Sequence, residues 1–259
     1  MYHNIFDTHA HYDHRLFNYT RHAILSGMPE FGVSLILNCG SNEESSDYSL
    51  YLAEEYPFIY SAAGIHPHDS ANVKYGWEER IMQSLSHPKV VAVGEIGLDY
   101  HYNFSDPISQ KKVFTKLVEI AIILDLPVVV HDREAHDDIL AILKEYRPKG
   151  VVHRFSGSID MMEQLIDLGL YLGFGCSIIY SNSISERNAI VKMPIERILL
   201  ETDCPYLPPP NHKNDLCRSD MIAYAADTIT ELLPEYTPQE VINITNTNGK
   251  RLFSLLNTE

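Results

Sequence analysis

Histidine and carboxylate side chains end several of the apolar runs in this sequence of 259 residues. In the first run, IFDTHAHYDHR, His9 and His11 follow the apolar pair Ile5 and Phe6. Because side chains alternate between the two faces of a strand, both imidazoles point to the same side. Later apolar runs end in the same kinds of residue, namely His66, Glu95, His131, His153 and Asp203. Paired imidazoles joined by single donors from other segments predict a metal site.

Six of these residues form a plausible ligand set: His9, His11, Glu95, His131, His153 and Asp203. Their nitrogen and oxygen donors suit Zn²⁺, Mn²⁺, Co²⁺ or Ni²⁺, and Mg²⁺ where water completes the coordination. Six ligands are too many for one catalytic ion that must keep an open position. Two divalent ions that share a carboxylate would use the set better, and Glu95, on the middle strand, is the predicted bridge.

Each candidate ligand taken alone also has a structural interpretation. A strand-end histidine can simply be hydrogen-bonded, Glu95 could pair with a buried arginine, and Asp203 could cap a turn or helix. Packing does not explain all six at the same end of successive buried strands, because burying them unpaired is costly. Six further histidines lack this placement and are expected at the surface or in caps: His3, His14, His22, His87, His101 and His136.

Eight apolar, β-rich runs recur along the chain, and continuous runs of this kind indicate strands buried on both faces of a parallel sheet. They are residues 5–11, 33–40, 59–67, 90–99, 126–133, 150–157, 170–175 and 198–206. Segments 110–125, 132–146 and 158–169 have apolar residues at helical spacing. After the last run, segments 219–235 and 237–256 also predict helices.

Eight βα units in this length are typical of a TIM-type (β/α)8 barrel, which has about 250 residues. We therefore expect an α/β fold with a single domain over residues 1–259, and a doubly wound open sheet is the alternative. In a barrel, the carboxyl ends of all strands share the face that holds the active site. That fold would bring the candidate ligands together.

The composition of the chain limits the kinds of partner that it can bind. The net charge is −15 with neutral histidines, so the whole surface cannot hold nucleic acid by counterion release. A phosphodiester substrate would need a local site, with metal ions supplying positive charge. No signal peptide or bilayer-spanning run is apparent, and the scattered cysteines suit reduced thiols in the cytoplasm. They are Cys39, Cys176, Cys204 and Cys217. Cys204, next to Asp203, should point away from the site as a buried thiol.

The motifs DTHAHYD, GIHPHD, GEIGLDY, LPVVVHDREA, HRFSGS, ETDCPYL and NGKRLF occur in this order through nearly the whole chain. In this order and spacing, the sequence resembles the TatD-like metal-dependent hydrolases, the TatD family deoxyribonucleases of the amidohydrolase superfamily. The resemblance implies a TIM-type barrel with a two-metal site. It also implies metal-dependent deoxyribonuclease activity that trims single strands from the 3′ end with Mg²⁺ or Mn²⁺.

The resemblance also implies roles for individual residues. One ion would be held by His9, His11, Glu95 and Asp203, and the other by Glu95, His131 and His153. His66 corresponds to a substrate-side residue near the metals.

Two segments depart from the family pattern. Arg154 stands in HRFSG where the family often has HCFSG, and the loop PPPNHKNDLCRSD lacks the usual RGK. His212, Lys213 and Arg218 supply basic character there instead. These changes leave the ligand set intact and bear on substrate identity and phosphate binding. The preceding PYLPPP should form a stiff extended loop beside the cleft.

The residues and the resemblance together predict a 3′-5′ exonuclease-type deoxyribonuclease, acting as a monomer on single-stranded DNA with two ions of Mg, Mn or Zn. Water activated by the metals would cleave the phosphodiester, with Glu95 as bridge and Asp203 as the base that takes the proton. His66, Arg133 and Arg154 are the candidates for phosphate contact.

Two other functions remain open. The same site could hydrolyse a small ester, lactone, amide or phosphotriester, because fold and metals do not choose the substrate. The fifth predicted strand ends in His131 and not in a lysine that could be carbamylated to bridge two metals. This favours the nuclease-type site over that of the other hydrolases. A protein that binds metal without catalysis is the more distant alternative, because structural sites are usually closed.

Overall fold

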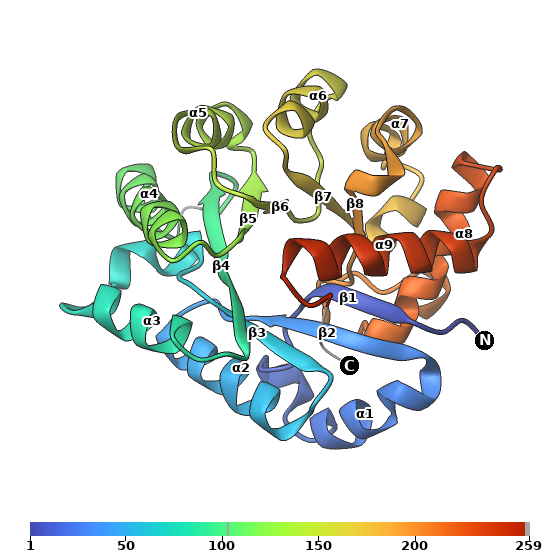
Figure 1. Ribbon diagram of the computed structural model, residues 1–259, viewed down its shortest axis with the longest axis horizontal. Helices are drawn as coiled ribbons and strands as arrows, with labels where there is room; N and C mark the ends of the chain where they lie inside the picture. Colours follow the sequence, from blue (N-terminus) through green and yellow to red (C-terminus); the bar gives the residue numbers. More distant parts are fainter. Residues whose placement is uncertain (103, 257–259) are drawn as a thin grey trace.

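The structure is a computed structural model that describes residues 1–102 and 104–256. Within these residues, eight parallel strands pair in sequence order from β1 to β8 (Figure 1). Their bounds are β1 Ile5–Ala10, β2 Val33–Cys39, β3 Ile59–Ala63, β4 Val90–Asp99, β5 Val128–Arg133, β6 Gly150–Val152, β7 Tyr171–Phe174 and β8 Ile198–Leu200. The sheet curls until its two edge strands meet.

The edges meet where β1 ends and the segment after β8 begins. The amide of His11 donates to the carbonyl of Cys204 at 2.8 Å, and the amide of Asp203 donates to the carbonyl of His9 at 2.9 Å. The predicted (β/α)8 barrel is therefore confirmed, and the open sheet is excluded. Closure also places the residues after β8 directly beside those at the end of β1.

Helices surround the barrel (Figure 1). They are α1 Arg21–Gly27, α2 Glu43–Glu55, α3 Trp77–Leu85, α4 Pro107–Ile123, α5 His136–Tyr146, α6 Ile159–Asp167, α7 Ile184–Lys192, α8 Ile222–Leu232 and α9 Pro238–Leu252. No described helix is both long enough and apolar enough to cross a bilayer.

Local sequence explains where several helices begin. The side chain of Asp106 caps α4, and Pro107 follows at the first helical position, where its missing N–H costs nothing. The side chain of Thr237 accepts from the amide of Glu240, whose carboxylate reaches back to the Thr237 amide. This capping box satisfies backbone groups that would otherwise lack partners at the start of α9.

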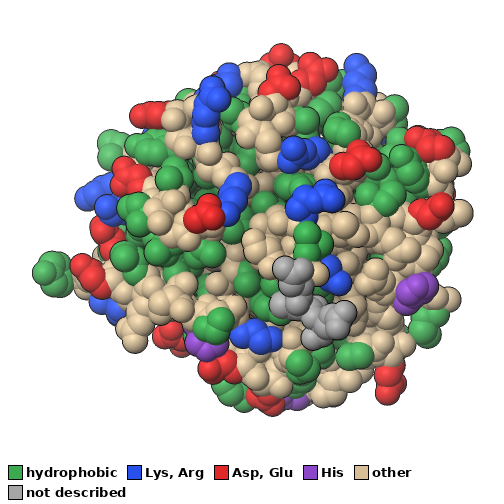
Figure 2. Space-filling view, viewed as in Figure 1, with side chains coloured by type: hydrophobic (Ala, Val, Ile, Leu, Met, Phe, Trp, Pro, Cys, Tyr) green, Lys and Arg blue, Asp and Glu red, His purple; other side chains and the backbone are tan. Residues whose placement is uncertain are grey.

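Helix α9 closes the amino-terminal end of the barrel and lies across it in Figure 1. The side-chain amide of Asn248 donates to the carbonyls of Ile195 and Ile198, each at 2.9 Å. These two residues lie just before β8 and at its start. One apolar cluster joins side chains from all eight strands to Leu252, the last residue of α9, and to Phe253, which follows it. On the face that α9 covers, acidic and basic side chains are interspersed (Figure 2). The opposite end, at the strand carboxyl termini, is left for the predicted site.

Several boundaries differ from the sequence-based prediction. Strands β3, β6 and β8 end before the apolar runs do, because the chain leaves the sheet and carries His66, His153 and Asp203 on the loops that follow. The sequence predicts a helix over 132–146, and the predicted start at residue 132 is wrong. Arg133 still pairs with Asp99 of β4, so β5 extends through it and α5 begins only at His136.

Candidate metal centre

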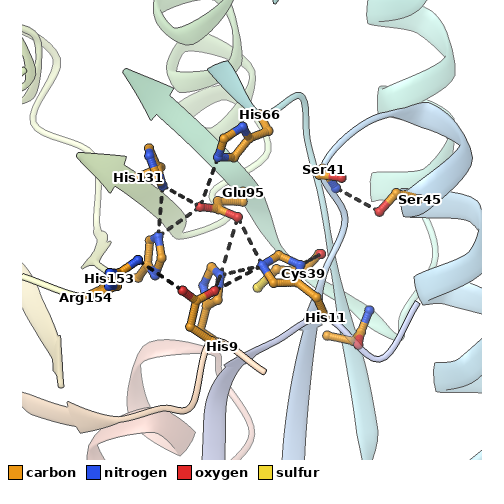
Figure 3. Close-up of polar contacts among 12 residues, drawn as sticks. His9, His11, Cys39, Ser41, Ser45, His66, Glu95, His131, His153 and Arg154 are labelled. Carbon is orange, nitrogen blue, oxygen red and sulfur yellow. Dashed lines mark hydrogen bonds and ion pairs between the residues drawn. The ribbon is translucent and has the colours of Figure 1, made fainter. Parts of the chain in front are cut away.

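The six predicted ligands converge at the carboxyl end of the barrel, around the carboxylate of Glu95 (Figure 3). His9 and Glu95 lie within β1 and β4, and His131 lies within β5. His11, His153 and Asp203 follow the ends of β1, β6 and, after two more residues, β8. Three overlapping groups have donor atoms that all lie within 4.8 Å of one another. The groups are His9, Glu95 and His153; His9, His11 and Asp203; and His66, Glu95 and His131.

One oxygen of Glu95 faces the pair of imidazoles from the first strand. Its Oε2 lies 3.5 Å from Nε2 of His9 and 3.3 Å from Nε2 of His11. The same two nitrogens lie 3.8 Å and 3.6 Å from Oδ1 of Asp203. They are 3.1 Å from each other. Four donor atoms from three segments thus surround one small volume.

The other oxygen of Glu95 faces a second set of imidazoles. Its Oε1 lies 2.9 Å from Nδ1 of His131 and 2.9 Å from Nε2 of His153. Nε2 of His66 is 3.6 Å away. The two oxygens of one carboxylate therefore serve two separate donor sets, which is the arrangement of a bridging ligand.

The spacing of these donors fits divalent ions. Ligands bound at about 2.0–2.1 Å lie roughly 3 to 3.5 Å from each other in tetrahedral or octahedral coordination. The donor separations around Glu95 fall largely in that range. Nε2 of His9 and Nε2 of His11 are 3.1 Å apart, a spacing that two ligands of one cation adopt. Imidazole nitrogens and carboxylates without thiolate also match the donor preference of Mg²⁺, Mn²⁺ and Zn²⁺.

Groups outside the cluster fix how two of the imidazoles face it. Nδ1 of His11 bonds the carbonyl of Cys39 at 2.8 Å, which turns Nε2 toward Glu95. Nε2 of His131 bonds Oδ2 of Asp99 at 3.1 Å, which leaves Nδ1 for the centre. Such outer partners set the tautomer of metal-binding imidazoles.

His66 presents a different tautomer. Its Nδ1 accepts a hydrogen bond from the amide of His68 at 3.2 Å, so its proton is on Nε2, which faces Glu95. Burial and the neighbouring imidazoles hold the pKa of His66 well below its usual value, although Glu95 opposes this. The neutral ring can therefore offer a hydrogen-bond donor to the centre.

Sequence reasoning missed two carboxylates behind the centre. Asp99, interpreted only as loop structure together with Tyr100, is the buried last residue of β4 and contacts His131. Glu201 lies 3.6 Å from Nδ1 of His153 through Oε1, which also accepts from the amide of Arg154. For Asp99 the alternation of a strand held the signal, because it stands an even number of positions from Glu95 within β4. Glu201 follows the end of β8, where alternation does not apply.

The charges of the cluster balance internally. Burial alone would raise the pKa of Glu95, but the imidazoles, with His66 foremost, outweigh it and keep that pKa well below its usual value. Burial is likewise outweighed at Asp203, where a hydrogen bond to His11 lowers the pKa to about 2. At His153, the charge of Glu95 overcomes burial and raises the pKa to about 10. Both central carboxylates are thus ionised at neutral pH, as ligands must be.

An open cavity of about 690 Å³ lies over the cluster. A second cavity of about 320 Å³ adjoins it, and Arg133 and Arg154 line both. Arg154 has a left-handed backbone with φ of 47°, and its Nη1 lies 3.5 Å from Oδ2 of Asp203. Backbone conformations of this rare kind gather at functional sites. The two arginines therefore bring positive charge to the cavities over the centre.

The loop after Asp203 forms one wall of the larger cavity, as the PYLPPP segment predicted. Pro205, Tyr206, Leu207 and Pro208 line it, with Lys213 and Asp215 from the atypical part of the loop. Cys204 is buried in the apolar core between strands and helices. The histidines predicted outside the site, His3, His14, His22, His87, His101 and His136, are exposed or half-buried. Among them, His14 also lines the larger cavity.

A closed (β/α)8 barrel with a cluster of histidines and carboxylates at the carboxyl ends of its strands defines a class, the metal-dependent hydrolases. A family model described as TatD related DNase matches residues 6–254. The chain therefore belongs to the TatD family, as its motifs predicted.

Individual relatives agree with this assignment. YabD of Bacillus subtilis, an uncharacterized metal-dependent hydrolase, is 33% identical over 254 residues, which cover 97% of this chain and 99% of the relative. The 3′-5′ ssDNA/RNA exonuclease TatD of Salmonella typhimurium is 34% identical over 232 residues, covering 87% and 89%. The crystal structure of YJJV, a TatD homologue from Escherichia coli, aligns with a TM-score of 0.91 at 32% identity, covering 98% and 99%.

Proposed function

We propose that this protein is a two-metal 3′-5′ exonuclease that acts on single-stranded DNA. The observation that carries the proposal is the position of Glu95, whose two oxygens face separate donor sets. The substrate class comes from relatives named 3′-5′ ssDNA/RNA exonuclease. The whole chain, residues 1–259, would work as one domain and as a monomer in the cytoplasm, and its four free cysteines are compatible with that location.

We assign the ligands by the two sides of Glu95. His9, His11 and Asp203 would hold one ion with Oε2, and His131 and His153 would hold the other with Oε1. Divalent ions of Mg, Mn or Zn bound there supply positive charge for a phosphodiester and lower the pKa of water.

The chain's own residues would then move the protons. Asp203 is ionised at neutral pH and faces the centre, so its carboxylate can take a proton from the attacking water. The water oxygen forms a bond to phosphorus, the bond from phosphorus to the leaving O3′ breaks, and Asp203 can return the proton to that oxygen. The terminal nucleotide would leave with a 5′-phosphate.

Three further side chains would hold the phosphate. Nε2–H of His66 can donate to a phosphoryl oxygen, because Nδ1 already accepts from the backbone. Arg133 and Arg154 line the two cavities that meet at the centre. Their positive charges are local to the site, as a chain with a net charge of −15 requires.

The test uses protein stripped of metal and 5′-labelled single-stranded DNA, with Mg²⁺, Mn²⁺ or Zn²⁺ restored separately. We expect a ladder that shortens from the 3′ end only with metal, and no ladder from Glu95→Ala. Asp69→Asn is the matched control, because Asp69 lines the same cavity but its carboxylate bonds Asn42. No cleavage of DNA by a protein that binds two ions and hydrolyses a small ester or lactone would replace this proposal with the alternative hydrolase.

A further inference from the structure

Two exposed aromatic rings lie together near the metal centre: Tyr102 lines the larger cavity, and Phe104 stacks on Tyr102. Tyr102 is 40% exposed and Phe104 is 66% exposed, and their rings are stacked with centroids 5.4 Å apart and planes 11° from parallel. Neither ring belongs to the apolar core clusters of the described residues. Exposing a stacked pair to water costs hydrophobic free energy, and the core gains no packing in return. We call Tyr102 and Phe104 the aromatic shelf.

A short chain of contacts holds the shelf beside the metal centre. The ring of His68 meets Tyr102 and Phe104 edge-on, with centroids 5.6 Å and 4.8 Å away. Nε2 of His68 bonds Oδ2 of Asp99 at 2.9 Å, and the same oxygen bonds His131. Two side chains, His68 and Asp99, therefore connect the shelf to the candidate ligand His131.

A positive charge adjoins the shelf. The guanidinium of Arg133 lies over the ring of Tyr102, 4.6 Å from its centroid, and the same side chain lines both cavities. The amide of Tyr102 donates to Oδ1 of Asp99 at 2.9 Å, which fixes the backbone below the ring. An aromatic surface and a cation side by side match the two parts of a nucleotide, its base and its phosphate.

We propose that the aromatic shelf stacks an unpaired nucleobase of the substrate strand while Arg133 contacts the neighbouring phosphate. This inference rests on the proposed function and adds the residues that would select single strands. Every base has a π-face, so stacking tolerates any sequence, whereas bases in a duplex are already stacked on each other. It also explains how an acidic chain could hold a polyanion through a few local contacts.

The experiment measures binding and turnover separately. Binding of a fluorescent single-stranded oligonucleotide is followed by anisotropy in Ca²⁺, and the same strand with abasic sites is compared. Turnover is measured on the oligonucleotide and on bis(p-nitrophenyl) phosphate, a diester too small to reach the shelf. The variants are Phe104→Ala, Tyr102→Ala and the ring-preserving Phe104→Trp. Tyr75→Ala is the control, because Tyr75 is 103% exposed and does not line either of these cavities.

For Phe104→Ala and Tyr102→Ala we expect weaker oligonucleotide binding and a raised KM by about five- to one-hundred-fold. In Phe104→Ala, whose ring lines neither cavity, affinity for the abasic strand and turnover of the small diester should stay within about two-fold of wild type. Phe104→Trp should restore binding, and Tyr75→Ala should change nothing. An equal loss on normal and abasic strands, or no loss on either, would overturn the proposal.

The two proposals fail in different ways. If the wild type binds the oligonucleotide through the shelf but cleaves no DNA with any metal, the shelf proposal is supported and the nuclease proposal is contradicted. If the wild type cleaves DNA and the shelf variants cleave it with unchanged KM, the nuclease stands and the shelf falls. A wild type that does not bind the oligonucleotide overturns the shelf outright.

Discussion

Single hydrogen bonds decide which nitrogen each imidazole turns toward the centre. The bonds from His11 to the Cys39 carbonyl and from His131 to Asp99 each occupy the nitrogen that faces away. His66 is set the opposite way by the amide of His68. At the scale of residues, the site therefore depends on groups that never touch the substrate.

Replacing Asp99 tests this dependence. In Asp99→Asn the partner of His131 becomes a neutral amide, so that imidazole loses the carboxylate that accepts from its Nε2. We expect metal affinity, measured by isothermal titration of the stripped protein with Mn²⁺, to fall about ten- to one-hundred-fold. Asp69→Asn, in the same cavity, should bind as the wild type does. Unchanged affinity in Asp99→Asn would remove Asp99 from the site.

At the scale of elements, the ends of strands and helices carry the functional groups and the stabilising contacts. Strand β5 continues through Arg133, and α5 then starts at His136, whose Nδ1 bonds Oδ2 of Asp132 at 2.8 Å. Helix α9 starts with the capping box of Thr237 and Glu240. Each of these junctions can be changed without touching a candidate ligand.

The Asp132–His136 pair predicts a pH dependence of stability. The hydrogen bond to Asp132 raises the pKa of half-buried His136 above its usual 6.5. Because the folded pKa exceeds the unfolded one, the pair stabilises fully below pH 6.5, and this contribution is lost as pH rises through the folded pKa. In urea unfolding, His136→Ala should lower the free energy of unfolding by about 0.5 kcal/mol more near pH 5.5 than near pH 8.5. Equal costs at both pH values would contradict the linkage.

The capping box predicts a stability change without a change in activity. Thr237→Ala leaves the amide of Glu240 without its side-chain acceptor. We expect the free energy of unfolding to fall by about 1 kcal/mol, with kcat/KM unchanged because α9 lies at the other end of the barrel. Thr237→Ser, which keeps the hydroxyl, should restore stability. Full stability of the alanine variant would show that the cap contributes nothing.

At the scale of the whole molecule, the two ends of the barrel do different work. The amino-terminal end is plugged by apolar side chains from α9, and the ring of Phe253 meets Phe6 edge-on at 6.0 Å. The carboxyl end holds the charged cluster under an open cavity. Stability and chemistry are thus concentrated at opposite ends, as is general for this fold.

Truncating the plug tests this division. Phe253 is 2% exposed, so Phe253→Ala should lower the free energy of unfolding by about 3–5 kcal/mol. Below its unfolding transition, the variant should keep the kcat/KM of the wild type. Leu256→Ala is the control, because Leu256 is 56% exposed and should change stability by less than about 0.5 kcal/mol. Loss of activity in folded Phe253→Ala would show that the two ends are coupled.

Metal binding should stabilise the whole barrel, because ions that bind only the folded state shift the unfolding equilibrium. Adding Mn²⁺ at about one hundred times its Kd to stripped protein should contribute about 2.7 kcal/mol per site. For a chain of this length, that raises Tm by roughly 5–10 °C. Differential scanning fluorimetry measures the shift, and Glu95→Ala should lose most of it. A wild type whose Tm does not change on addition of Mn²⁺, Mg²⁺ or Zn²⁺ would contradict the proposed metal centre.

The sequence by itself determined the barrel and the types of donor at its mouth. Continuous apolar runs predict a parallel sheet, and strand alternation places His9 and His11 on one side, so both features follow from local periodicity. Because a barrel gathers all strand ends on one face, the convergence of His131, His153 and Asp203 could be predicted without coordinates. The family followed from the order of the same motifs.

Only the tertiary structure decided which atoms face each other. The separate donor sets at the two oxygens of Glu95 arise from strand tilt and loop paths, which no periodicity encodes. Asp99 lies thirty-two positions from His131 in the chain, and their hydrogen bond exists because β4 and β5 pair in one particular register. The stacking of Arg133 on Tyr102 has the same origin. Contacts between distant segments depend on register and side-chain direction, and these are set only when the whole barrel closes.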